Sequence, residues 1–137
     1  MSKIEGGCLC GSVRYKSDAE PAFIGVCHCV TCQKNSGSSF SLNLGMPADS
    51  VTIEGNSLAT YEDHSGASGK PFYRKFCSSC GSPIASGGEA YDGLIFIKAG
   101  TLDDSSWVTP VAHIWCSEKQ PWVKIEDGVA QMERNPE

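Results

Sequence analysis

The sequence lacks long hydrophobic runs, an excess of positive charge and an apolar leader segment. No apolar stretch approaches the roughly 20 residues that a transmembrane helix needs, so we expect no membrane association. The 16 Asp and Glu residues outnumber the 11 Lys and Arg residues, and the net charge of −5 argues against nucleic acid as a partner. Because residues 1–7 contain no apolar h-region, we expect a cytoplasmic protein in a reducing compartment.

Cysteine, in contrast, is abundant, with eight in a chain of 137 residues. Seven of them form three tight clusters: Cys8 and Cys10, then Cys27, Cys29 and Cys32, then Cys77 and Cys80. In a reducing compartment, cysteines at such short spacing indicate zinc held by thiolates rather than disulfides. A disulfide between Cys8 and Cys10 would also close a very small ring with poor geometry.

The three clusters divide between two kinds of zinc site. Zinc has four ligands at a structural site, and three protein ligands with an open position at a catalytic site. If the triplet shared a metal with one pair, five cysteines would crowd one ion and two would be left over. The simplest partition is two zinc ions per chain, one held by Cys8, Cys10, Cys77 and Cys80, the other by Cys27, Cys29 and Cys32.

The second set lacks a fourth ligand, and two residues compete for that place. Cys116 has no spaced partner, and an isolated cysteine is more typical of a small buried residue. In an extended segment the His28 side chain would point away from the face shared by Cys27 and Cys29, which favours packing over ligation. A second structural zinc completed by either residue and a zinc with an open position both remain open.

The two expected sites differ in what they can do. A zinc that joins Cys10 to Cys77 would close most of the chain into one loop and so restrict the unfolded state. A zinc bound by three thiolates can still bind another thiol, which would lose its proton and be oriented for attack. We therefore expect a structural first site and chemistry on an added thiol at the second.

Short runs of β-branched and aromatic residues alternate with turn signals along the chain. Strands are expected near residues 12–15, 40–44, 51–53, 72–76 and 94–97, which predicts a single all-β domain over residues 1–126. Turns are expected at Gly6-Gly7 and Gly87-Gly88, and an exposed loop at residues 65–70. Only residues 29–36 look able to form a helical turn, and the polar residues 127–137 are expected to form a loosely held tail.

Three motifs together carry a resemblance to a known family. They are Gly7-Cys8-x-Cys10-Gly11-Ser12-Val13-Arg14-Tyr15, Cys27-His28-Cys29-x-x-Cys32-Gln33-Lys34 and Phe76-Cys77-x-x-Cys80-Gly81-Ser82-Pro83-Ile84. Their order resembles that of the glutathione-dependent formaldehyde-activating enzyme (GFA) family and of the related centromere-protein-V-like domains. The similarity extends from about Gly6 to Val123.

The resemblance implies a β-tent fold, in which zinc pins sheets of short antiparallel strands. It implies a structural zinc at Cys8, Cys10, Cys77 and Cys80. It also implies a more labile zinc at Cys27, Cys29 and Cys32, which would be catalytic as ligands of that metal. It also implies a carbon–sulfur lyase that forms S-hydroxymethylglutathione reversibly, with glutathione as co-substrate and formaldehyde as the carbonyl compound. A small-molecule thiol adduct is thus the expected partner.

Two other functions stay open at this stage. A non-catalytic zinc module would use both metals structurally and would bind a protein partner or a thiol ligand, with Trp107, Trp115 or Trp122 at the contact. A nucleic-acid binder of the zinc-ribbon type is disfavoured by the acidic charge. The candidates for positioning the carboxylates of a small anionic ligand are Gln33, Lys34, Arg14 and Arg74, each of which is more typical of a surface residue.

Overall fold

The computed structural model describes residues 4–66 and 68–135. Within these residues the fold is mostly β, with eleven strands in two sheets and one short α-helix, so the predicted all-β class is confirmed. The smaller sheet has three strands in the order β1 (Ile4–Gly7), β2 (Arg14–Ser17) and β5 (Thr52–Glu54), and its pairs are antiparallel.

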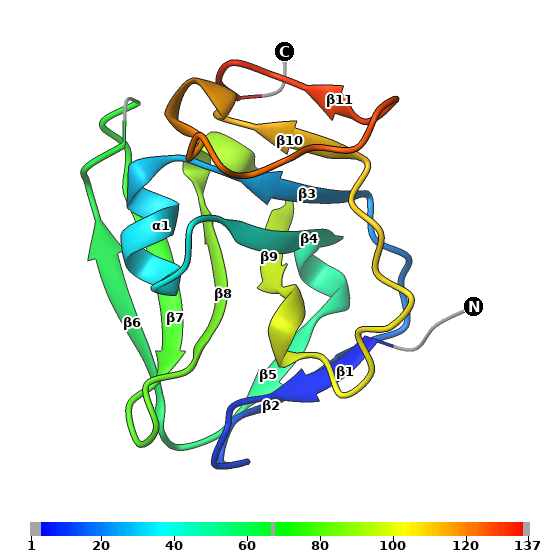
Figure 1. Ribbon diagram of the computed structural model, residues 1–137. Helices are drawn as coiled ribbons and strands as arrows, with labels where there is room; N and C mark the ends of the chain where they lie inside the picture. The colour runs from blue at the N-terminus through cyan, green and yellow to red at the C-terminus, as the bar shows by residue number, and fades with distance from the viewer. Residues whose placement is uncertain (1–3, 67, 136–137) are drawn as a thin grey trace.

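The larger sheet has eight strands and forms the body of the molecule. Its order is β11 (Ala130–Gln131), β10 (Ala112–Ile114), β3 (Phe23–Cys27), β4 (Ser41–Pro47), β9 (Leu94–Lys98), β8 (Pro83–Gly88), β7 (Phe72–Cys77) and β6 (Leu58–Asp63). Neighbours are antiparallel, except that β10 runs parallel to β3 and β11. In Figure 1 β10, β3 and β4 cross the molecule horizontally while β6, β7 and β8 run almost vertically, so the sheet bends between its two halves.

The hydrophobic core lies between the small sheet and one face of the large sheet. Ile4 of β1 joins Leu44 of β4 and Ile97 of β9 in one cluster, and all three are fully buried. Side chains alternate between the faces of a strand, so the neighbouring residues Asn43 and Phe96 project from the opposite face of the large sheet. That opposite face is free to form a ligand site.

The helix lies where the sequence predicts it. Helix α1 (Val30–Ser36) begins after the N-cap Cys29, whose Sγ accepts a hydrogen bond from the Cys32 backbone N–H over 3.2 Å. Gly37, with φ of 71°, ends it. Single 3₁₀ turns occur at η1 (Ala48–Ser50), η2 (Glu89–Tyr91), η3 (Ala99–Thr101) and η4 (Cys116–Glu118). None of the described helices has the length and apolar character needed to cross a membrane.

Two glycine pairs that we expected in turns lie in strands. Gly6 and Gly7 belong to β1, and Gly87 and Gly88 belong to β8. A Cβ on Gly6 would collide with the Thr101 carbonyl oxygen, and one on Gly88 with that of Pro71. Glycine here allows two backbones to approach closely, which composition does not distinguish from a turn.

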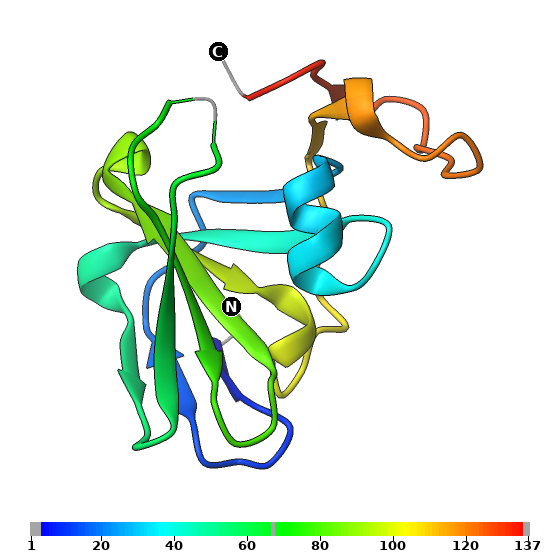
Figure 2. The same ribbon diagram turned by 90° about the vertical axis from the view of Figure 1, so that its left-hand side faces the viewer.

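Residues 130–134, within the segment expected to form a C-terminal tail, pair with the large sheet and the turn that follows β10. β11 pairs with β10, and the backbone N–H groups of Trp115 and Cys116 donate to the carbonyl oxygens of Arg134 and Met132 over 3.1 and 3.0 Å. Figure 2 shows this segment at the same end of the molecule as the hairpin of β6 and β7.

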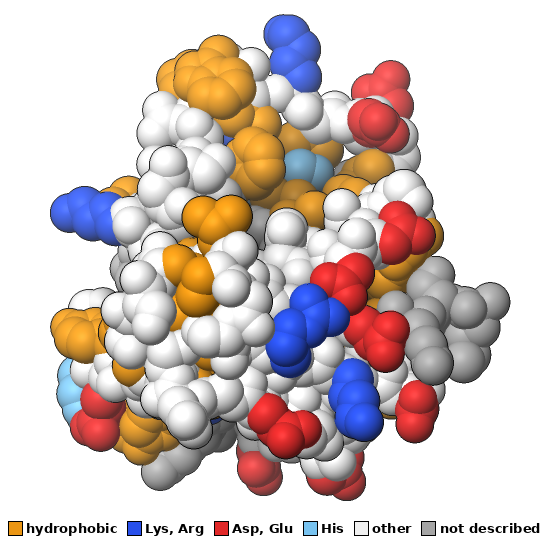
Figure 3. All heavy atoms as spheres, turned by 90° about the horizontal axis from the view of Figure 1, so that it is seen from below, with side chains coloured by type: hydrophobic (Ala, Val, Ile, Leu, Met, Phe, Trp, Pro, Cys, Tyr) orange, Lys and Arg blue, Asp and Glu red, His pale blue; other side chains and the backbone are white. Residues whose placement is uncertain are grey.

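The surface carries charges of both signs. On the face drawn in Figure 3, Lys and Arg side chains lie among Asp and Glu side chains.

Candidate metal sites and the adjoining cavity

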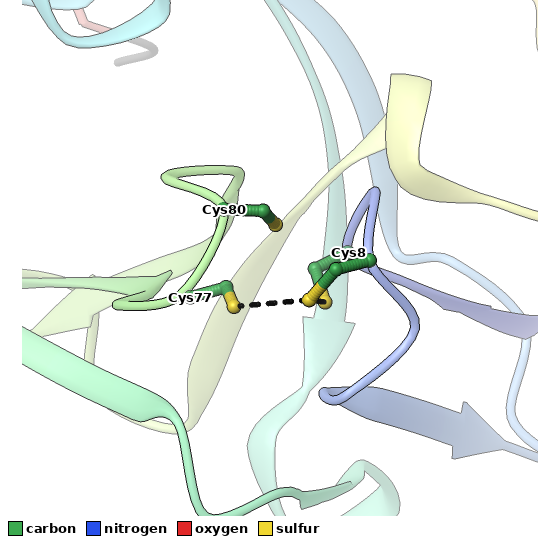
Figure 4. A group of neighbouring side chains, drawn as sticks. Cys8, Cys77 and Cys80 are labelled. Carbon is green, nitrogen blue, oxygen red and sulfur yellow. Dashed lines mark hydrogen bonds between the residues drawn. The ribbon is translucent and has the colours of Figure 1, made fainter.

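The four cysteines expected at the structural site converge from two loops. Cys8 and Cys10 lie between β1 and β2, Cys77 ends β7, and Cys80 lies in the turn before β8. Their Sγ atoms all lie within 4.8 Å of one another, and three of these side chains meet in Figure 4. The Sγ atoms of Cys10 and Cys77 are 3.8 Å apart across 67 residues of sequence. Four convergent thiols suit the tetrahedral coordination of zinc.

Neighbouring hydroxyl groups favour the thiolate forms of two members of this cluster, Cys77 and Cys80. Hydrogen bonds from Ser12 and Ser57 lower the pKa of Cys77 to about 5. A hydrogen bond from Ser82 lowers the pKa of Cys80 to about 7. Because the thiolate is the form that binds metal, these contacts prepare the cluster for a cation.

The other three clustered cysteines meet where β3 passes into α1. Cys27 ends β3, Cys29 caps the helix and Cys32 lies in its first turn, and the three Sγ atoms lie within 4.8 Å of one another. Hydrogen bonds with Cys27 and Cys29 lower the pKa of Cys32, while hydrogen bonds with Cys29 and Cys32 raise the pKa of Cys27. Thiols that share protons in this way suit a divalent cation, which displaces those protons on binding.

Neither candidate for a fourth ligand belongs to this three-cysteine group. The His28 ring is fully buried, and its Nε2 lies 2.8 Å from Nδ1 of His113. Burial, and then the neighbouring His113, lowers the pKa of His28 to about 4, so the ring is neutral near pH 7. Cys116 Sγ lies 3.5 Å from the His113 carbonyl oxygen, to which it donates. Both side chains have packing and hydrogen-bonding roles.

A cavity of about 610 Å³ adjoins the three-cysteine group. Cys27, Cys29 and Cys32 all line it, whereas its described lining includes no member of the four-cysteine group. The volume lies within the range of about 300 to 1,000 Å³ that is typical of small-molecule sites. One cysteine group therefore faces a ligand-sized space and the other does not.

The floor of the cavity is the face of the large sheet that points away from the core. Cys27 pairs with Ser41, and two residues further along β4 Asn43 pairs with Lys98 of β9. Lys98 is 8% exposed, and its Nζ donates to Asn43 Oδ1 over 2.9 Å. Burial lowers the pKa of Lys98, while the nearby Cys32 thiolate acts in the opposite direction. A buried lysine with an amide partner thus lies near the cysteines.

The next row of the floor is aromatic. Gly45 pairs with Phe23 on one side and with Phe96 on the other, and both phenylalanines line the cavity. A Cβ on Gly45 would lie 3.4 Å from each of these two side chains, so the glycine leaves the space between them open. The other apolar lining residues are Pro71, Phe72, Ala90, Tyr91, Leu94, Ile114 and Trp115.

Only one of the two arginine candidates lies at the cavity. Arg74 lines it, and its Nε donates to Asp63 Oδ2 over 2.9 Å, with the two side chains only 10% and 8% exposed. Arg14 pairs instead with Asp103, with Nη1 2.9 Å from Oδ1, in an exposed contact that is not part of the cavity lining. The arginine in the cavity wall therefore already has a charged partner.

The C-terminal segment completes the wall. Asn135 Oδ1 accepts hydrogen bonds from Trp115 Nε1 at 2.7 Å and from the Tyr91 hydroxyl at 3.1 Å. All three residues line the cavity. Trp115 has a φ of 56°, a left-handed conformation that a bulky residue adopts only when its surroundings hold it there. The sequence carries no local signal for this arrangement.

Comparison with known proteins agrees with the cysteine geometry. The family model described as "Glutathione-dependent formaldehyde-activating enzyme" matches residues 3–118. The chain belongs to this family. The match covers all seven clustered cysteines and both predicted metal groups, so the resemblance inferred from the motifs is confirmed. Asn135 and β11 lie beyond the matched residues.

The solved structures with a similar fold include the crystal structure of a Rhodobacter sphaeroides protein determined as a structural-genomics target. The TM-score is 0.58 at 16% sequence identity, and the alignment covers 73% of this chain and 88% of that chain. Similarity at this level shows the fold alone. No curated protein matches the sequence significantly.

Proposed function

We propose that the protein is a zinc-dependent carbon–sulfur lyase, which makes and breaks the bond between the sulfur of a glutathione-type thiol and the carbon of an aldehyde. The observation that carries this proposal is that Cys27, Cys29 and Cys32 form a metal-binding group and also line the cavity. Three ligands at the wall of a ligand-sized space are typical of a zinc site with an open position. Family membership supports S-hydroxymethylglutathione as an adduct of this kind.

The reaction needs no redox partner. A zinc ion held by these three cysteines would lower the pKa of an added thiol and favour the thiolate. As the adduct forms, the thiol sulfur bonds to the carbonyl carbon, the π electrons of the C=O bond move to oxygen, and that oxygen takes up the proton that the thiol gave up. The reverse reaction breaks the carbon–sulfur bond and returns thiol and aldehyde.

Lys98 is our candidate for the residue that stabilises the oxygen of the adduct. Its ammonium group is buried in the cavity floor next to the row of Cys27, and Asn43 holds it in place. A positioned cation acts strongly on a developing negative charge where water is excluded. We propose that Lys98 donates a hydrogen bond to the oxygen and that Asn43 orients Lys98.

The four-cysteine group has a structural role in this proposal. Cys8, Cys10, Cys77 and Cys80 would hold a second zinc ion that joins the small sheet to the end of β7. None of the four is among the described residues that line the cavity, so the proposal gives them no part in the chemistry. We place the protein in the cytoplasm, where a reducing environment keeps such thiols able to bind metal.

The proposal is tested by the exchange between glutathione, formaldehyde and their adduct, followed by NMR exchange spectroscopy. We expect zinc-loaded protein to accelerate the exchange and the Cys29→Ser variant to lose the acceleration. Serine is a good N-cap, so this variant removes a ligand but keeps the cap of α1. The proposal fails if wild-type protein gives no acceleration, or if Cys29→Ser exchanges as fast as wild type.

A second candidate, a non-catalytic binding module, is favoured by the exposure of Trp122, which is 66%. Trp107 packs against the core and Trp115 lines the cavity, so Trp122 is the tryptophan of the three that a partner could cover. This candidate requires a protein ligand to close the metal at the three-cysteine group. X-ray absorption of the bound metal would show four protein ligands and no change on adding glutathione.

A further inference from the structure

We infer that the aldehyde handled at this site carries an uncharged, apolar group about the size of an aromatic ring, so that the preferred adduct is larger than that of formaldehyde. The inference rests on the proposed function, because it specifies the carbonyl half of the same reaction. Its basis is the order in which chemically different residues follow one another along the floor of the cavity.

The floor presents three kinds of surface in succession. The cysteine group comes first, at Cys27. The pair of Asn43 and the buried Lys98 lies one step along the strands, and the backbone positions of Phe23 and Phe96 lie one step beyond that pair. The Phe23 ring reaches back over Gly25, the partner of Asn43, so the aromatic surface begins beside the hydrogen-bond donor and continues to Phe96.

An adduct of a thiol with an aldehyde matches this order. Its central carbon carries a sulfur, an oxygen, a hydrogen and one further substituent. With the sulfur at the cysteine group and the oxygen at Lys98, the further substituent is directed over Phe23 and Phe96. In the formaldehyde adduct that substituent is only a hydrogen atom, and the aromatic row would be left in contact with water, without the gain from burying apolar surface.

Two glycines shape the aromatic surface. Gly45 contributes no side chain beside the Phe96 ring, and the Phe23 ring lies over Gly25, where a Cβ would collide with it. Tyr91 packs edge-on against Phe96, with the ring centroids 5.2 Å apart, and walls off one side. A flat apolar group can pack against these rings, since aromatic rings favour stacked and edge-to-face contacts.

The charges in the cavity argue against an anionic substituent. Arg74 is paired with Asp63, and Lys98 is committed to Asn43 and the cysteine end of the site. The remaining lysine of the lining, Lys70, is exposed to solvent in the loop between β6 and β7. A carboxylate placed between Phe23 and Phe96 would lose its hydration without gaining a free cation.

The test compares three aldehydes with glutathione on the full zinc-loaded chain by NMR exchange spectroscopy: formaldehyde, phenylacetaldehyde and glyoxylate. We expect kcat/KM for phenylacetaldehyde to exceed that for formaldehyde by at least roughly tenfold, and glyoxylate to be the poorest substrate, in line with the discrimination that apolar pockets achieve. Acceleration with formaldehyde but not with phenylacetaldehyde would overturn this inference and leave the proposed function intact. No acceleration with any aldehyde would overturn both.

Binding gives a readout that does not depend on turnover. S-benzylglutathione and S-methylglutathione differ only in the group beyond the sulfur, and titration calorimetry should show the benzyl compound binding at least roughly tenfold more tightly. Phe96→Ala should remove most of that preference, and Phe96→Leu, which keeps more of the packing, should remove less. Tyr61→Ala, an exposed aromatic outside the cavity lining, is the control. Equal affinities, weaker benzyl binding or no binding of either compound would contradict the inference.

Discussion

Lys98 and Asn43 lie side by side on neighbouring strands, with the lysine Nζ 2.9 Å from the asparagine Oδ1. Lys98 is 8% exposed, so its ammonium group depends on this amide and on the nearby thiol groups for compensation. A buried cation next to three cysteines is costly to maintain for packing alone. Lys98 lies between the cysteine group, where the thiol would bind, and the aromatic row, where the substituent of the aldehyde would lie. This position links the thiol and the aldehyde of the proposed reaction.

Replacing Lys98 tests that link. We expect Lys98→Met to lower kcat for adduct exchange by about 100-fold with a smaller change in KM, because the lost hydrogen bond acts mainly on the developing oxygen charge. Lys75→Met is a matched control, since the Lys75 Nζ donates to Thr60 in an exposed contact. A Lys98→Met variant with the kcat of wild type would show that the lysine has no such role.

The two cysteine groups should differ in their effect on folding. We expect Cys80→Ser to abolish soluble, folded protein, because its metal would join Cys10 to Cys77, which are 67 positions apart in the sequence, and so close a long loop. Cys29→Ser should retain cooperative melting, and Cys116→Ser serves as the control outside both groups. Expression yield and thermal melting by circular dichroism measure this. Normal yield and melting of Cys80→Ser would rule out the structural role.

The ion pair of Asp63 and Arg74 should contribute to stability in a pH-dependent way. Burial alone would raise the pKa of Asp63, but hydrogen bonds from Ser65 and Arg74 outweigh it and hold the pKa at about 2, below the ordinary 3.8. We expect Asp63→Asn to cost about 3 to 5 kcal/mol near pH 7, because it leaves Arg74 buried without its partner.

The sign of the pH dependence follows from the lowered pKa of Asp63. The unfolded state binds this proton more readily, so the stabilisation is complete above the unfolded pKa of 3.8 and is lost as the pH falls towards 2. Urea unfolding of wild type and of Asp63→Asn at a series of pH values measures the difference between their free energies of unfolding. Loss of metal at low pH affects both proteins equally and therefore cancels in this difference. A difference that stays constant down to pH 2 would contradict this account.

Asn135 should fix the positions of Trp115 and Tyr91 in the wall of the cavity. We expect Asn135→Ala to destabilise the protein by about 1 to 3 kcal/mol through the loss of two hydrogen bonds, and to alter the fluorescence of Trp115. Asn135→Asp keeps an acceptor oxygen at the same place and is the control. If Asn135→Ala and Asn135→Asp bind S-benzylglutathione with equal affinity, Asn135 does not position the wall.

The features that the sequence predicts correctly are the ones with local chemical signals. The spacing of the cysteines identifies both metal groups, and the short segment before Gly37 identifies the helix. Local sequence signals do not predict the residues of the cavity floor. Asn43, Lys98 and Phe96 come together because β4 and β9 pair in one register, and that pairing joins residues about fifty positions apart.

The glycines and the C-terminal segment show a different limit. Gly6 and Gly88 carry a turn signal, yet each is required in a strand where another backbone comes close. Asn135 lies in a polar segment with no periodic pattern, and its role depends on Tyr91 and Trp115, which are distant in sequence. Tertiary contacts decide these cases, and composition does not report them.

The zinc content of the full chain tests the central claim most directly. Protein purified without chelator should contain roughly two zinc ions per chain, and this should fall towards one after incubation with glutathione and desalting, because an open three-cysteine site is accessible to thiols. Cys29→Ser should contain one zinc before and after the treatment. Two zinc ions that remain in wild type after glutathione, or two in Cys29→Ser, would contradict an open zinc site at Cys27, Cys29 and Cys32.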